Sequence, residues 1–338
     1  MEFSKKRDER IDILRAIAIL CIIIAHSNPN GLILQLRNFD VILMVFLMGA
    51  SFFLSNRGKE IRYGNYIFKR FRRLILPTWI FLIIFFIVYY FLSIILGDKY
   101  YFSANEIVTS FTLTSGIGYV WIMRVFFIGA MVTPVLLFIS NKVKRHSIFF
   151  LLLLIAYALY ALLLSAGKYI PIDIAQNLFE YYILQGFGYS LVIALGIRLY
   201  TFRGNHLLII SFTFLCMFIL LMIYHDFSST QAYKYPPTIY YLSYGLFVSF
   251  ILYYILKFDR IRNFFYKSPI IFLSHKSLDI YYCHVFPIYV IELFGKNIPL
   301  INYSFYTRLF FIIFCTAVLL CIKLLFLKAP NKIRNLSI

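Results

Sequence analysis

The chain has 338 residues, of which 62% are hydrophobic and only 14% are charged, and its mean hydropathy is +0.82. A water-soluble domain cannot bury so large an apolar fraction, so the composition excludes a soluble enzyme or binding module and indicates a membrane protein. The formal net charge of +19 does not indicate a nucleic-acid partner, because Lys and Arg cluster between apolar runs as membrane topology requires.

About ten apolar runs are long enough to cross a hydrocarbon core of about 30 Å, which takes about 20 residues of helix. They lie at residues 12–27, 39–55, 74–96, 119–140, 147–166, 180–199, 206–224, 238–256, 277–294 and 303–325. The sequence therefore predicts an all-α polytopic membrane protein, a bundle of about ten transmembrane helices. The segments between these runs are too short to fold alone, so we expect no soluble extramembrane domain.

Lys and Arg are distributed unequally between the two sides of these predicted spans. Most of the 33 lie on the side that holds both chain ends and the segments 56–73 and 257–276. The positive-inside rule places that side in the cytoplasm, so both termini are expected there, with the chain in a plasma or inner cell membrane. Membrane lipids are expected partners, and anionic headgroups would suit the basic segments.

The first predicted span reads RIDILRAIAILCIIIAHSN over residues 10–28 and contains Arg15 and His26. Eleven residues make just over three helical turns, so both side chains project from nearly the same face, about 16 Å apart along the axis. Ionisable groups inside a span are costly and normally face a protein interior or water, which favours a functional pair. The alternative is that Arg15 reaches the inner interface beside Asp12 and that His26 is interfacial.

A basic segment precedes the third predicted span. It reads NYIFKRFRRLILPTW, with Lys69, Arg70, Arg72 and Arg73 directly before Leu74. Arg70 and Arg73 share a face if this turn is helical. Guanidinium groups bind phosphate through paired hydrogen bonds, so these two arginines at the cytoplasmic mouth suit a phosphorylated ligand. For any one of these residues, ordinary anchoring at the cytoplasmic surface is the alternative.

Five stretches of the sequence form a pattern. In chain order they are RIDILRAIAILCIIIAH with its Arg-x10-His spacing, VILMVFLMGASFFLS, KRFRRLILPTW with Arg-x-x-Arg, YVWIMRVFFIGAMVTPVLL and SLDIYYCHVFPIYV. Together they resemble motifs of the integral membrane acyltransferase family 3, the polysaccharide O-acetyltransferase type. Tyr119 stands where the family often has His, and no hydrolase-like domain is expected after the last span. The resemblance implies a single integral membrane acyltransferase domain over residues 1–338.

The resemblance also implies a reaction. We expect an O-acyltransferase, of the class that transfers groups other than amino-acyl groups, that moves acetyl from cytoplasmic acetyl-CoA to a hydroxyl of an extracytoplasmic carbohydrate. The acceptor would be a glycan or glycolipid, such as capsule, O-antigen or exopolysaccharide. His26 and Arg15 would be catalytic, with His26 as general base or as a transient acyl carrier. The donor head would be held by Arg15, Lys69, Arg70 and Arg73.

Acceptor residues are expected on the outer side. Trp121 and Arg124 lie one turn apart in the fourth span. Tyr235 lies in the stretch YKYPPTIYY, and His284 lies inside the ninth span. Aromatic rings pack against sugar rings and an arginine binds hydroxyls or an anionic sugar, although interfacial aromatic belts and a structural buried His are the alternatives. No Cys pair and no His or carboxylate spacing fits a metal site, so we predict no metal.

A transporter or flippase of a lipid-linked saccharide is the main alternative function. Charged residues inside a helical bundle also mark transport pathways. Transporters often contain internal repeats with interrupted helices, and this sequence shows no such symmetry. A carbohydrate polymerase or ligase would be expected to have a large outer loop, whereas the outer segments here are short.

Overall fold

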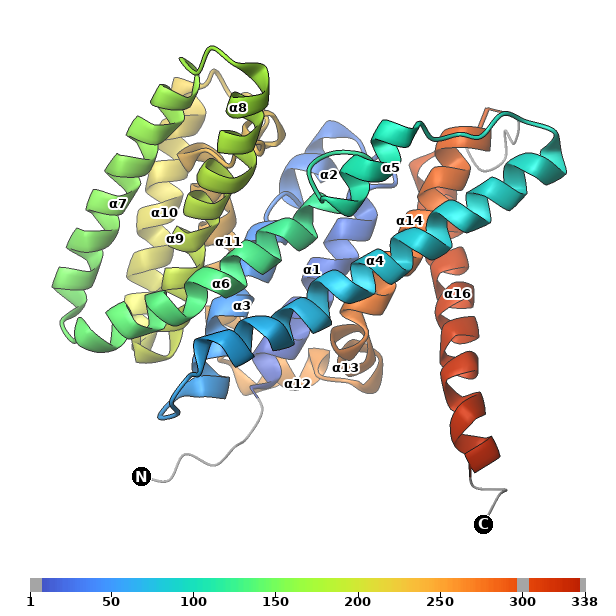
Figure 1. Cartoon of the computed structure of the whole chain (residues 1–338). Coiled ribbons are helices and arrows are strands. Elements are labelled where there is room, and N and C mark those ends of the chain that lie inside the picture. Colours follow the sequence, from blue (N-terminus) through green and yellow to red (C-terminus); the bar gives the residue numbers. More distant parts are fainter. Residues whose placement is uncertain (1–7, 297–303, 335–338) are drawn as a thin grey trace. The chain divides into compact units, whose positions relative to one another are not determined.

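A computed structural model describes residues 8–296 and 304–334, with side chains through residue 325. Every regular element in these ranges is helical, as Figure 1 shows. The chain folds into two compact units. Unit 1 comprises the residues up to Asp40 together with those from Arg262 onward, and unit 2 comprises Val41–Ile261. That residues 1–338 act as a single membrane domain stays a prediction.

Unit 1 is built around its first helix. Its elements are α1 (Glu9–Ala25), α2 (Gly31–Leu36), α13 (Ser268–His275), α14 (Ser277–Phe294) and α16 (Phe305–Arg334), while α12 (Asp259–Phe265) crosses the boundary between the units. Helix α1 packs against α13, α14 and α16, and α14 packs along α16. Helix α1 begins after Asp8, whose carboxylate accepts a hydrogen bond from the backbone N–H of Arg10. It ends at His26, whose backbone N–H donates to the carbonyl oxygens of Ile23 and Ile24.

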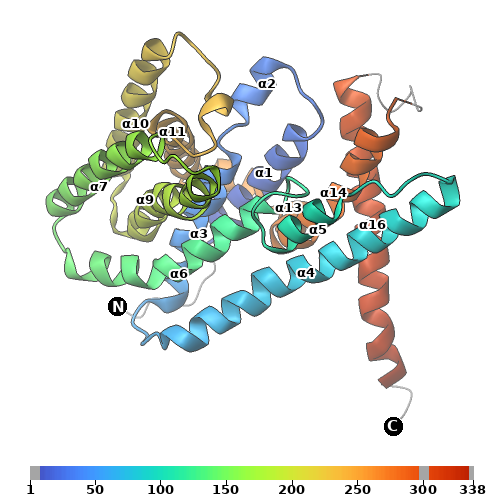
Figure 2. The ribbon, with the colours of Figure 1, turned by 45° about the horizontal axis from the view of Figure 1, so that its top comes forward.

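Unit 2 contains most of the long apolar helices. Its elements are α3 (Asp40–Asn56), α4 (Tyr63–Leu96), α5 (Ala104–Phe111), α6 (Trp121–Lys142), α7 (His146–Gly167), α8 (Asp173–Leu178), η1 (Phe179–Leu184), α9 (Gln185–Arg198), η2 (Leu199–Thr201), α10 (Gly204–Tyr224), η3 (Thr230–Tyr233) and α11 (Ile239–Ile255). Helix α4 packs against α6, α6 and α7 pack against α9, and α10 packs against α11, an arrangement that Figure 2 shows. Exposed apolar side chains such as Ile95, Leu154 and Leu220 cover the outward faces of α4, α7 and α10. Such faces are expected to contact lipid.

Two glycines let α3 and α9 approach each other at backbone distance. A Cβ atom at Gly49 would overlap the carbonyl oxygen of Ile193, and one at Gly196 would overlap that of Phe46. Small residues permit this kind of close crossing between helices in membrane proteins. A larger residue at either position would separate the two helices.

Helices lie over all ten predicted spans, and the prediction of an all-helical, multi-pass membrane protein is confirmed. Among the described residues, the helices that are long and apolar enough to cross a membrane number seven: Gly31–Asn56, Tyr63–Leu96, Trp121–Lys142, His146–Gly167, Asp173–Thr201, Gly204–Tyr224 and Phe305–Leu325. Helices α11 and α12, bent by 102°, would make an eighth. The count of about ten is not confirmed, since α1 has only 17 residues and α14 contains Asp279 and Glu292. The chain ends, including Lys5, Lys6 and Arg7, lie outside the described residues, so their cytoplasmic side stays a prediction.

Helix α4 begins well before the predicted start of the third span at Leu74. Its first residue is Tyr63, so the basic segment that we expected to precede the span is part of the helix. Hydropathy detects apolar runs, whereas Lys and Arg also favour the helix and do not end it. The side chains of Lys69, Arg70 and Arg73 therefore have fixed helical spacing.

Candidate active site

Arg15 on α1 contacts two buried side chains of unit 1. Asp12, one turn earlier, is 1% exposed, and Ser274 on α13 is 2% exposed. The Ser274 hydroxyl donates to Asp12 Oδ1 at 2.9 Å, and Arg15 Nη1 donates to Ser274 Oγ at 3.3 Å. Arg15 Nη1 lies 3.6 Å from Asp12 Oδ1, an ion pair longer than a normal hydrogen bond. The Asp12 contact considered as an alternative role for Arg15 is therefore present, with Ser274 as a third member.

His26, at the other end of α1, lies beside His284 of α14. The ring centroids are 5.5 Å apart and the ring planes are tilted by 46°. His284 is fully buried, and its Nδ1 is hydrogen-bonded to the carbonyl oxygen of Tyr281, one turn earlier. Because a carbonyl oxygen only accepts, Nδ1 carries the proton in the neutral ring and Nε2 is an acceptor. The structure thus brings together two histidines that are far apart in the sequence.

Arg15 and His26 belong to the same helical element. Arg15 lies in the second turn of α1, and His26 is the C-cap of that helix. Eleven positions at the helical rise place them about 16 Å apart along the axis. Both residues are half-buried. A ligand that contacts both side chains must extend over about that distance.

The basic residues of α4 form a second predicted group, in unit 2. Arg70 and Arg73 lie on one helical face, as the sequence predicts for a helical turn, and Lys69 lies one turn before Arg73. The guanidinium of Arg70 lies 5.0 Å from the centre of the Tyr66 ring, a contact that limits its directions. Lys69 and Arg73 are exposed, and Arg70 is half-buried. This face, which we call the basic face of α4, combines fixed spacing with access for an anion.

Trp121 and Tyr235, both predicted to bind the acceptor, are in contact in unit 2. Their ring centroids are 4.8 Å apart at 87°, an edge-to-face arrangement. Lys234 is buried beside them, with Nζ 5.9 Å from the Trp121 ring, 5.7 Å from the Tyr235 ring and 5.9 Å from the Tyr241 ring. Tyr235 is 50% exposed, so this aromatic cluster reaches the surface. Lys234 was not predicted as a site residue, and its signal in the sequence is a single Lys between two Tyr residues.

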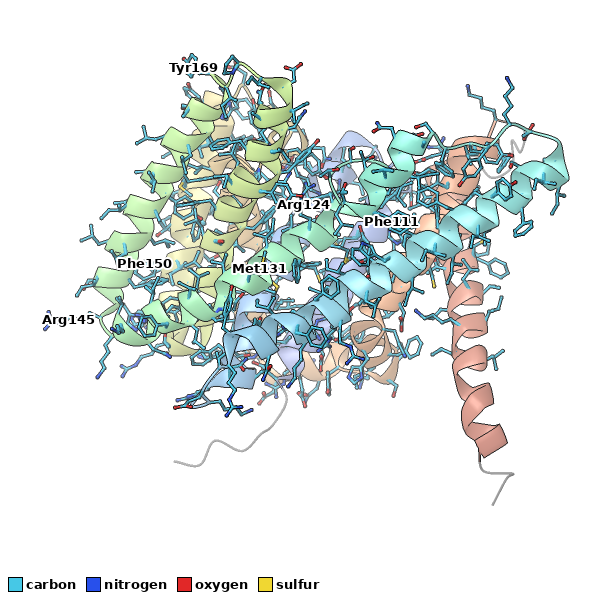
Figure 3. The ribbon with its side chains drawn as sticks, in the orientation of Figure 1. Phe111, Arg124, Met131, Arg145, Phe150 and Tyr169 are labelled. Atoms are coloured by element: carbon cyan, nitrogen blue, oxygen red, sulfur yellow. The ribbon has the colours of Figure 1, made fainter. Side chains whose placement is uncertain are left out.

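Arg124 lies one turn from Trp121 but has different partners. Its guanidinium donates to the carbonyl oxygens of Leu113 and Thr114 and to Gln185 Oε1, the last two at 3.0 Å. It also lies 4.4 Å from the centre of the Tyr181 ring. Figure 3 shows Arg124 near the start of α6, by the loop that follows Phe111 at the end of α5. The structure thus gives Arg124 a role in ordering this loop, and its direct contact with the acceptor stays a prediction.

The described side chains near these sites supply imidazole, guanidinium and ammonium groups, which suit proton transfer and anion binding. Within residues 8–296 and 304–334, no group of three or more His, Cys, Asp or Glu side chains is arranged to hold a metal ion. The roles of His26 and Arg15 in catalysis and of His284 toward the acceptor stay predictions.

Comparison with known proteins identifies the family. No curated protein and no solved structure matches the chain significantly. A family model described as an acyltransferase domain matches residues 8–327, nearly the whole chain. The matched range includes α1 with Arg15 and His26, the basic face of α4 and the start of α6. The resemblance is therefore confirmed, and the chain belongs to the membrane acyltransferase family 3.

Proposed function

We propose that this membrane acyltransferase moves an acetyl group from cytoplasmic acetyl-CoA to a hydroxyl of a carbohydrate on the outer side of a cell membrane. The observation that carries the proposal is the family match over α1, the helix that bears Arg15 near its start and His26 at its end. Membership of an acyltransferase family favours this function over the alternative of a transporter or flippase for a lipid-linked saccharide.

The donor has a nucleotide head rich in phosphate and a thin pantetheine arm that ends in the thioester. Guanidinium groups pair with phosphate oxygens through charge-assisted hydrogen bonds. We assign Arg70 and Arg73 of the basic face of α4, with Lys69, to the phosphates, and Arg15 of α1 to the same head. The extended arm is similar in length to the separation between Arg15 and His26, about 16 Å by the helical rise. The length of the donor arm therefore suits the separation between Arg15 and His26.

His26 is the proposed general base. A neutral imidazole nitrogen takes the proton of the acceptor hydroxyl while the hydroxyl oxygen bonds to the thioester carbonyl carbon. The C–S bond then breaks, the acetyl ester stays on the carbohydrate, and the sulfur leaves with the bonding electrons. The imidazolium returns its proton to that sulfur, which restores neutral His26 and releases CoA as the thiol. General-base catalysis of this kind contributes about 10²–10⁴-fold to the rate.

The acceptor is proposed to bind at the aromatic cluster of unit 2. Trp121 and the exposed Tyr235 provide apolar ring faces and edges that suit a sugar ring. Lys234, buried beside both rings, adds a positive charge that would attract an acidic sugar. These features suit a sugar ring, and the proposed acceptor is an extracytoplasmic glycan or glycolipid, such as capsule, O-antigen or exopolysaccharide.

The test is acetyl transfer by the purified protein in detergent, with acetyl-labelled CoA and a panel of polysaccharides. We expect base-labile label on a glycan, formed together with free CoA. His26→Ala should slow transfer about 10²–10⁴-fold, as loss of a general base predicts. His206→Ala removes an exposed histidine of α10 and should leave the rate unchanged. Equal transfer by His26→Ala would remove His26 from catalysis, and label trapped on His26 itself would replace the base with an acyl carrier.

A further inference from the structure

Ser274 lies outside the residues assigned above and joins α13 to α1. A serine hydroxyl has one proton to donate and two lone pairs that accept. Here the Ser274 hydroxyl donates a hydrogen bond to Asp12 Oδ1 and accepts one from Nη1 of Arg15. The hydroxyl therefore connects the carboxylate to the guanidinium. Asp12 and Ser274 are both almost fully buried, which restricts their rotamers and makes this connection a fixed one.

The placement of Ser274 changes how Arg15 uses its donors. A carboxylate that pairs directly with a guanidinium tends to take two parallel N–H donors, the same pair that a phosphate uses. In this structure Asp12 Oδ1 is 3.6 Å from Nη1, and its short hydrogen bond is to Ser274 instead. The charge of Asp12 attracts Arg15 across 3.6 Å, and the Ser274 hydroxyl forms the hydrogen bonds that connect the two residues. This arrangement fixes the position of Nη1 and so orients the guanidinium.

The surrounding contacts keep Ser274 in register with Arg15. Helix α13 packs against α1. A second link at the same end of α1 joins Arg262 Nε to Glu9 Oε2 at 3.0 Å. The position of Ser274 relative to Arg15 is therefore set by helix packing as well as by its own hydrogen bonds.

We propose that Ser274, together with Asp12, is a positioning residue for the acyl donor: it holds Arg15 in the orientation that binds the phosphate-bearing head of acetyl-CoA. The inference rests on the proposed function, in which Arg15 contacts that head. Ser274 of α13 would thus contribute to donor affinity. The buried carboxylate of Asp12 would orient Arg15 in addition to neutralising its charge.

The experiment measures CoA binding and steady-state kinetics of the full-length protein in detergent. Ser274→Ala should raise the Kd for CoA and the KM for acetyl-CoA about tenfold, the effect of losing a hydrogen bond to a charged group, while kcat changes less than about twofold. Ser274→Thr keeps the hydroxyl and should restore most of the affinity. In an Arg15→Ala background, Ser274→Ala should add little, because the two residues act as one unit.

A matched control separates positioning from general packing. Ser249→Ala removes another buried serine hydroxyl, one that donates to the carbonyl oxygen of Gly245 in α11, and should leave CoA affinity unchanged. Thermal unfolding of each variant checks the fold, and Ser274→Cys is measured instead if Ser274→Ala does not fold. Wild-type affinity in Ser274→Ala, or an equal loss in the Arg15→Ala background, would overturn the inference. Failure of the proposed function is a different result: the wild-type protein itself would neither bind CoA nor transfer acetyl.

Discussion

The rings of His26 and His284 lie 5.5 Å apart, although one residue caps α1 and the other lies inside α14. The hydrogen bond from His284 Nδ1 to the carbonyl oxygen of Tyr281 fixes the tautomer of His284 and directs an acceptor nitrogen away from that carbonyl. The buried imidazole of His284 restricts the orientations of His26, the proposed general base. We therefore expect His284 to support His26.

Replacing His284 tests this support. His284→Phe keeps an aromatic ring of similar volume but removes both nitrogens. We expect kcat to fall about 10–100-fold, as for the loss of an outer partner that orients a functional histidine, with the KM for the donor unchanged. His206→Phe, at an exposed position of α10, is the control for a His-to-Phe change. Wild-type kcat in His284→Phe would show that the imidazole nitrogens of His284 do not assist His26.

The basic face of α4 is expected to bind the donor head. Arg70→Ala with Arg73→Ala removes two guanidinium groups from one face, and hydrogen bonds to charged groups contribute about 1.5–3 kcal/mol each. The KM for acetyl-CoA should rise at least about tenfold, which is 1.4 kcal/mol, and kcat should change little.

Arg72→Ala provides the matched control for the basic face. Arg72 lies in the same turn but faces Phe68, with its guanidinium 5.9 Å from that ring. Arg72→Ala removes the same charge from the helix as either Arg70→Ala or Arg73→Ala but leaves the basic face intact. A rise in KM of the same size in Arg72→Ala would indicate general electrostatic attraction of the donor rather than a specific site.

Arg124 offers a choice between two roles. Because it donates to Leu113, Thr114 and Gln185, its removal would leave buried acceptors without a donor, at about 1–3 kcal/mol for each such group. We expect Arg124→Ala to lower the free energy of unfolding measured by denaturation in detergent, and Arg124→Lys to recover part of it. Unchanged stability with a raised KM for the glycan would instead establish a direct contact with the acceptor.

The crossing of α3 and α9 is expected to tolerate no side chain at Gly196. A methyl group there would overlap the carbonyl oxygen of Phe46, so Gly196→Ala must separate the helices. Overpacking of this kind costs about 1–3 kcal/mol, which thermal unfolding would detect. Gly64→Ala, at a position with open space around it, should be neutral. If both variants unfold at the wild-type temperature, the two backbones are farther apart than described.

Much of the fold could be predicted from the sequence, because an apolar run long enough to cross a membrane has few alternatives to a helix. Helices lie over the predicted runs within the described residues, but only seven helices there are long and apolar enough to span a membrane, so the count of about ten is not confirmed. Helix α1 has only 17 residues, and Asp279 and Glu292 lower the apolarity of α14. The early start of α4 at Tyr63 was missed for a related reason, since hydropathy does not register helix formation by Lys and Arg.

The candidate site was only partly predictable. The spacing of Arg15 and His26 within one helix predicted that they project from nearly the same face. The local sequence predicted the basic face of α4. Contacts between distant segments carry no such signal. Ser274 reaches Arg15 from α13, and Gln185 reaches Arg124 from α9. Which of these side chains are in contact depends on how the helices pack. The periodicity of the sequence does not predict that packing.

The measurement closest to the central claim is acetyl transfer across a sealed bilayer. Proteoliposomes would hold labelled acetyl-CoA on one side and a glycan acceptor on the other, with wild-type protein or His26→Ala in the membrane. The account predicts an acetyl ester on the glycan, with CoA retained on the donor side, for the wild-type protein only. Esters formed equally well by His26→Ala, or passage of an unmodified glycolipid without acetylation, would contradict it.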